Sequence, residues 1–127
     1  MNGALALAAF NLICTGTLTS KSVDQEVTKP YSIEYRVNLD EGLWCDGECK
    51  VIKQIQEVQP TQLTLMDFRG FGVLGRQWTT IRVNRETGKH IAVESFDQGS
   101  LTASLSNWDG TCERKEFTGF PEFKTKL

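Results

Sequence analysis

The sequence predicts a small all-β domain, an antiparallel meander of about eight strands that forms a barrel or a sandwich. Three observations predict this fold. Apolar and polar residues alternate with period two, glycine-containing turns separate the alternating segments, and no segment has a convincing helical period. The chain has 127 residues, which fits one domain.

The clearest alternation covers residues 31–39, where apolar side chains at every second position are separated by polar ones. Residues 10–18 alternate in the same way. β-Branched and aromatic residues, which favour strands, predict further strands at 51–58, 62–68, 77–85, 90–96, 100–105 and 111–117. A short helix is the alternative for the segment 51–58, because its apolar residues also fit that period.

Glycines mark the expected turns, because they adopt the positive φ angles that tight turns require. The turns are Asp40-Glu41-Gly42, Asp46-Gly47, Asp109-Gly110, and residues 84–89, which predict a type I turn closed by a glycine bulge. Residues 70–75 match G-x-G-x-x-G, but a strand follows them in place of the helix that a dinucleotide site needs. We interpret them as a hairpin loop.

Four cysteines in a chain with an apolar start predict two disulfides and an oxidising compartment, periplasmic or extracellular. Cys45 and Cys49 flank a tight reversal, and Cys14 and Cys112 lie where a closed meander places its first and last strands side by side, so these pairings are favoured. Zinc bound by all four cysteines is the alternative, although its usual ligand spacing is absent.

The N-terminal residues 1–9 are apolar and small, which indicates the remnant of a secretory signal before a single β domain at 10–127. No apolar run reaches the length of a transmembrane span. The net charge is −2 and no basic stripe occurs, so nucleic acid is not an expected partner. No cofactor or metal is expected.

The candidate contact residues are apolar or aromatic side chains near expected loops: Phe71, Val73, Leu74, Trp78 and Trp108. Phe71, Val73 and Leu74 would form an apolar tip on the expected hairpin loop. Residues 68–77 would then form a lid over the mouth of the barrel. His90 is the only histidine, and its place after a hairpin turn predicts a solvated side chain. No catalytic residue set is therefore expected, and acidic pairs such as Asp40 with Glu41 are interpreted as turn residues.

Several segments lie in a suggestive order: Phe10 to Thr17, Tyr35-Arg36-Val37 before Trp44-Cys45 and Cys49, Val83 to Gly88, and Cys112 before Phe117 to Pro121. Together they resemble a group of small exported bacterial proteins of unknown function, which implies export and two disulfides but no activity. Cys14-Thr15-Gly16 also resembles, more loosely, the periplasmic C-type lysozyme inhibitors. That family lacks a close pair like Cys45 and Cys49.

These observations favour a binding or interaction module without catalytic activity. One form is a lipocalin-like carrier that encloses a small apolar ligand. Another, which the lysozyme-inhibitor resemblance implies, is a protein inhibitor of a cell-wall enzyme. A hydrolase based on carboxylates is the weakest alternative, because it needs acidic groups that converge in a cleft.

Overall fold

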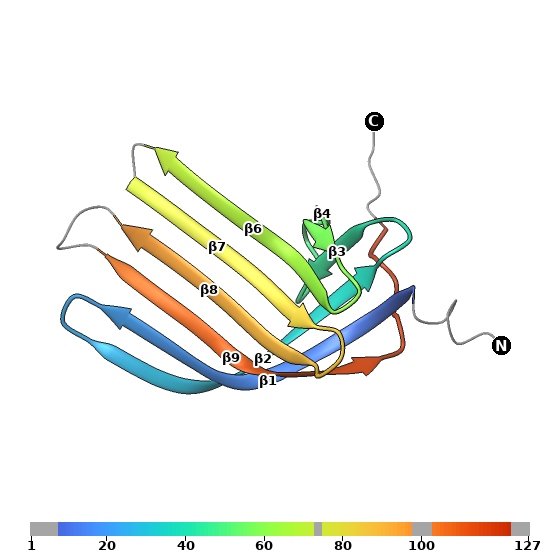
Figure 1. The fold of residues 1–127 in the computed structure, drawn as a ribbon, viewed down its shortest axis with the longest axis horizontal. Coiled ribbons are helices and arrows are strands. Elements are labelled where there is room, and N and C mark those ends of the chain that lie inside the picture. Colours follow the sequence, from blue (N-terminus) through green and yellow to red (C-terminus); the bar gives the residue numbers. More distant parts are fainter. Residues whose placement is uncertain (1–7, 73–74, 98–102, 123–127) are drawn as a thin grey trace.

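The computed structural model describes residues 8–72, 75–97 and 103–122, which form one nine-stranded antiparallel sheet (Figure 1). Its order is β4-β3-β2-β1-β9-β8-β7-β6-β5. The strands are β1 (Ala9–Ser22), β2 (Glu26–Asn38), β3 (Leu43–Asp46), β4 (Lys53–Gln54), β5 (Glu57–Val58), β6 (Gln62–Gly72), β7 (Gly75–Asn84), β8 (Lys89–Asp97) and β9 (Ser104–Lys115). The predicted meander is confirmed, and a single sheet excludes the sandwich.

The sheet curls into a half-barrel, so that strands far apart in its order share one core. The buried cluster combines side chains of β1 to β3 with those of β6 and β7: Phe10, Leu12, Cys14, Tyr35, Val37, Trp44, Leu63, Leu65 and Val83. Leu63 and Leu65 of β6 both reach this core, and a bulge between Thr64 and Met66 turns Met66 toward the same side. The core therefore fills the inner, concave face at one end of the sheet.

The segment between β4 and β5 joins the two edges of the sheet at that same end. The Ile55 N–H donates to the carbonyl of Gly42 over 2.8 Å, and the Gln56 N–H donates to the carbonyl of Thr64 over 3.1 Å. In Figure 1, β3 and β4 lie at the end opposite the β1–β2 and β6–β7 hairpins. The strand predicted at 51–58 is wrong because this segment crosses between edges, which leaves only two residues for each short strand.

The two disulfides have the pairing that the sequence favoured. Cys14 is bonded to Cys112 and Cys45 to Cys49, which excludes the zinc alternative. Cys14 and Cys112 face each other on the neighbouring strands β1 and β9. Cys45 and Cys49 close the turn that contains Gly47, whose φ of 58° is positive as predicted. Two disulfides are typical of proteins from oxidising compartments.

The hairpin between β7 and β8 has the predicted form. The Gly88 N–H donates to the Asn84 carbonyl over 2.9 Å, and Gly88 has a φ of 79°. The Asn84 side-chain oxygen accepts from the N–H groups of Glu86 and Thr87. This turn therefore satisfies its own backbone and starts β8 directly before His90.

Two predictions about the second half of the chain are wrong. Asp109-Gly110 is no turn, because β9 runs continuously through both residues and replaces the two strands expected at 100–105 and 111–117. Position 110 requires a glycine because the backbone of Thr15 on β1 leaves no room for a Cβ atom there. The lid expected at 68–77 is also absent, since residues 68–72 belong to β6 and residues 75–77 to β7. Val73 and Leu74 lie outside the described residues.

Candidate functional site

Four residues on four neighbouring strands form one row across the concave face. Gly16 on β1 is paired with Tyr31 on β2 and Gly110 on β9, and Gly110 is paired with His90 on β8. A Cβ atom added to Gly110 would overlap the Thr15 carbonyl and lie 2.6 Å from the Tyr31 hydroxyl. The two glycines therefore open the space in which the side chains of Tyr31 and His90 meet.

His90 is fully buried, and both of its ring nitrogens have partners. The Tyr31 hydroxyl lies 2.7 Å from Nδ1, and the Tyr35 hydroxyl lies 2.8 Å from Nε2. A neutral imidazole has one N–H donor and one acceptor nitrogen. One tyrosine therefore donates its proton to the ring, while the other accepts the ring N–H. The expectation that His90 is solvated is wrong.

The environment keeps all three members of this Tyr31–His90–Tyr35 cluster neutral at pH 7. Burial lowers the pKa of His90 to about 4, although the nearby Asp109 carboxylate opposes that shift. Burial, and then Asp109, raise the pKa of Tyr31 to about 12. Burial also raises the pKa of Tyr35 far above its usual value, with a smaller contribution from Asp46. The neutral cluster therefore holds β2 and β8 together through its two hydrogen bonds.

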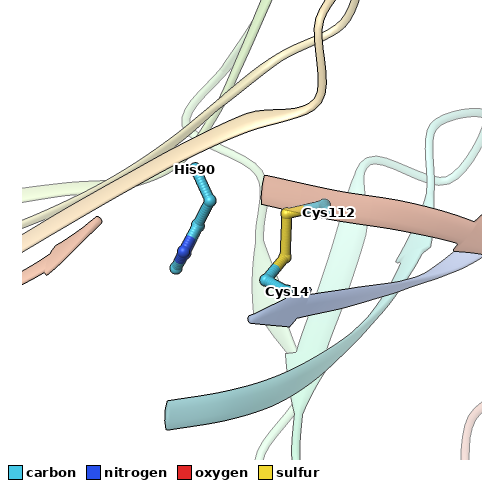
Figure 2. Close-up of side chains that lie close together, drawn as sticks. All are labelled: Cys14, His90 and Cys112. Carbon is cyan, nitrogen blue, oxygen red and sulfur yellow. A yellow bond between two sulfur atoms is a disulfide. The ribbon is translucent and has the colours of Figure 1, made fainter. Parts of the chain in front are cut away.

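The Cys14–Cys112 disulfide lies beside this cluster, one row further along the sheet (Figure 2). The two sulfur atoms and a ring nitrogen of His90 lie within 4.8 Å of one another. Metal binding would need cysteine thiolates, whereas these sulfur atoms are bonded to each other. The disulfide and the cluster together fix β2, β1, β9 and β8 to one another.

Beyond this cluster the concave face has a hollow of about 340 Å³. Its apolar walls come from β2, β6, β7, β8 and β9, and comprise Ile33, Tyr35, Met66, Ile81, Ala92, Val93 and Trp108. Three charged residues also line it, namely Asp46, Lys53 and Glu94. The arrangement offers an apolar cleft with polar groups at a few points, which is typical of small-ligand sites.

Of the sequence-predicted contact residues that the structure describes, which are Phe71, Trp78 and Trp108, only Trp108 lines this hollow. Trp108 is paired with Leu18 on β1 and Ala92 on β8, so its side chain shares their inner face. Strand alternation places the side chains of Phe71 and Trp78 on the outer face of the sheet. There, the Arg69 guanidinium lies 4.8 Å from the centroid of a Trp78 ring.

The outer face carries a second hollow of about 410 Å³ near the β6–β7 hairpin. Phe71 and Trp78 line it together with Arg69 and Arg76. Phe71 is 81% exposed, and the Arg76 guanidinium lies 6.0 Å from its ring centroid. The structure therefore separates the predicted contact residues onto opposite faces of one sheet.

Sequence reasoning missed most of the concave site. Alternation within each strand indicates which residues share a face. It does not reveal which faces of β2 and β7 meet across the curl. One signal was present, since Gly16 lies inside a segment of strand composition, where glycine often marks a close approach. Gly110 gave no such signal, because Asp109-Gly110 has the composition of a turn.

Comparison of the chain with known protein families, curated proteins and solved structures finds no match. Within the described part of the chain, no helix is long and apolar enough to cross a membrane. The chain forms a disulfide-bearing, antiparallel all-β domain.

Proposed function

We propose that this protein is a binding module of the periplasm or the extracellular space that takes a small, largely apolar ligand in its concave hollow. The single observation that carries the proposal is the hollow itself. At about 340 Å³ it falls within the range of about 300–1,000 Å³ that is usual for small-molecule sites. The two disulfides support an oxidising compartment.

The chemistry of the walls defines the ligand class. Trp108 provides a flat aromatic surface, and Ile81 and Met66 provide aliphatic surface on the neighbouring part of the cleft. Lys53 and Glu94 can each pair with one polar group of a ligand. A ligand with an aromatic or aliphatic body and one polar end therefore fits this hollow best.

The rigid end of the half-barrel supports this reading. The Tyr31–His90–Tyr35 cluster and the Cys14–Cys112 disulfide fix the strands that border the hollow. A cleft that is shaped before binding loses less conformational freedom when its ligand binds. Both ring nitrogens of His90 are hydrogen-bonded to tyrosines, which favours a structural role for this histidine over acid–base chemistry.

The test uses phenylnaphthylamine, a neutral apolar dye whose fluorescence increases in apolar surroundings. We expect saturable binding to the wild-type protein. Trp108→Ala should weaken it roughly thirtyfold, because truncation of a large aromatic contact costs about 2 kcal/mol. Trp78→Ala is the matched control, since it removes the same side chain from the outer face, and it should leave the affinity unchanged.

Two results would contradict the proposal. One is the absence of saturable binding by the folded, disulfide-bonded protein. The other is the reverse ranking of the two variants, with Trp78→Ala weakening the binding and Trp108→Ala having no effect. The second result would place the site on the outer face, beside Arg69.

A further inference from the structure

The charged residues that line the concave hollow differ in whether they have partners. Lys53 has one, since its ammonium nitrogen lies 4.7 Å from the centroid of a Trp44 ring. Glu94 is half-buried in the wall, and its carboxylate forms no hydrogen bond or ion pair with the described part of the chain. A partly desolvated charge is stabilised by an opposite charge beside it. The position of Glu94 therefore favours a cation in the hollow.

Strand register places Glu94 beside the aromatic surface of the hollow. Ala92 is paired with Trp108 and Glu94 with Ser106, so Glu94 and Trp108 are diagonal neighbours on the inner faces of β8 and β9. Diagonal neighbours of this kind lie roughly 7–8 Å apart. An ammonium group between them can pair with the carboxylate and also lie over the face of the indole ring.

The other charges around the hollow do not oppose a cation. Asp46 and Lys53 carry opposite charges on the neighbouring strands β3 and β4, which leaves the charge of Glu94 uncompensated. The charge of Asp46 reaches the wall, because burial and, to a smaller extent, Asp46 raise the pKa of Tyr35 far above its usual value. His90 adds no positive charge at pH 7, since burial lowers its pKa to about 4. The local field is therefore negative.

We propose that the ligand of the concave hollow is a cation with an apolar body, whose amine or quaternary ammonium group binds between Glu94 and Trp108. This inference rests on the proposed function and adds the sign of the ligand's charge. The carboxylate supplies a charge-assisted contact and the indole ring a cation–π contact. An anion of the same shape would meet an uncompensated negative charge at the same place.

The orientation of the ligand follows from the order of residues along β7 and β8. Three successive pairs of the inner face are Val83 with His90, Ile81 with Ala92, and Thr79 with Glu94. Val83 belongs to the core cluster, and Ile81 packs against it. Glu94 is therefore in the pair furthest from the core. The apolar body of the ligand lies toward Ile81, and its charged end points away from the core.

Three compounds with the same phenylbutyl body test the sign of the charge. Phenylbutylamine is a cation at pH 7, phenylbutanol is neutral and phenylbutyrate is an anion. Their affinities follow from displacement of phenylnaphthylamine, measured by fluorescence. Phenylbutylamine should bind roughly tenfold more tightly than phenylbutanol, because hydrogen bonds to charged groups are stronger than those between neutral groups. Phenylbutyrate should bind most weakly.

Two substitutions of Glu94 locate the cation. Glu94→Gln keeps the shape of the side chain and removes its charge, so the preference for phenylbutylamine should be lost while the affinity for neutral phenylnaphthylamine stays unchanged. Glu94→Lys should reverse the order and favour phenylbutyrate. Glu113→Gln is the matched control, since it changes the net charge equally. Glu113 is exposed on the outer face, where its Oε2 lies 3.4 Å from the Lys115 ammonium, so this variant should keep the wild-type preference.

The outcomes separate this inference from the proposed function. If phenylnaphthylamine binds saturably and the three compounds displace it equally, or if the preference for phenylbutylamine survives in Glu94→Gln, the cation site is overturned and the binding function stands. A preference for phenylbutyrate that is lost in Lys53→Gln would also overturn it, because the polar end would then lie at Lys53. Absence of saturable binding of phenylnaphthylamine and, by calorimetry, of phenylbutylamine would overturn both.

Discussion

Lowering the pH from neutral to about 4 should destabilise this protein through His90 in particular. The unfolded chain exposes the imidazole, whose pKa is then close to its ordinary value of 6.5, whereas burial lowers the pKa to about 4 in the folded state. Between these two pH values the unfolded state binds a proton that the folded state does not. The free energy of unfolding must therefore fall as the pH decreases through this interval.

The structure also sets the magnitude of this effect. The interval from pH 6.5 to about pH 4, at about 1.4 kcal/mol per pH unit, corresponds to about 3 kcal/mol of lost stability. His90 has no solvent-exposed surface, so solvent does not screen this contribution. The stability is fully present above pH 6.5, and its loss is complete below about pH 4.

Urea unfolding followed by circular dichroism at pH 7.5, 6.5, 5.5 and 4.5 would measure this loss. Carboxylates also titrate in this range, so His90→Gln serves as the control. Its amide provides a donor and an acceptor for the two tyrosines but has no charge to gain. Between pH 7.5 and pH 4.5 the stability of the wild type should fall by about 2.5 kcal/mol more than that of the variant. Parallel curves for the two proteins would refute the reasoning.

Two further predictions concern the same end of the half-barrel. Gly110→Ala should lower the free energy of unfolding by about 3 kcal/mol, because the added Cβ overlaps backbone; thermal unfolding would measure this, and an unchanged melting temperature would contradict it. Replacing Cys14 and Cys112 by alanine should cost about 4–5 kcal/mol, because that disulfide spans 98 residues, whereas replacing Cys45 and Cys49 should cost about 2 kcal/mol, because that disulfide spans 4. Chemical unfolding of the two double variants would test the ranking, and equal losses would contradict the chain-entropy argument.

Much of the fold follows from local patterns in the sequence. Period-two alternation and explicit turn residues account for the long strands, and the close pair Cys45 and Cys49 indicates its own disulfide. The order of the strands follows as well, because a meander that closes on itself places Cys14 next to Cys112. Such features depend on residues that are neighbours in sequence or on neighbouring strands, which short-range rules describe well.

The wrong predictions for Gly110 and His90 have the same physical cause, because both residues contact side chains of strands that are not their neighbours in the sheet. Asp109-Gly110 has the composition of a turn, yet Gly110 serves to admit the side chain of Tyr31 from two strands away. His90 follows a hairpin turn, yet two tyrosines of β2 bury it. Local propensity cannot describe these contacts, because the curl of the whole sheet creates them.

Local sequence patterns also could not predict the concave hollow. Trp78 and Trp108 look equivalent in sequence, as aromatic residues near expected loops. Strand register places Trp108 on the inner face and Trp78 on the outer face. A shift of one residue in either register would exchange these faces, so the position of a binding residue depends on the paired strands.

We propose that the concave hollow binds a small apolar ligand. The most direct test is a nuclear magnetic resonance titration with phenylnaphthylamine that follows the indole N–H signals of the three tryptophans. Trp44 lies in the core, Trp78 on the outer face and Trp108 in the hollow. We expect the Trp108 signal to shift to saturation while the signals of Trp44 and Trp78 remain in place. A shift of Trp78 alone, or of none of the three, would contradict it.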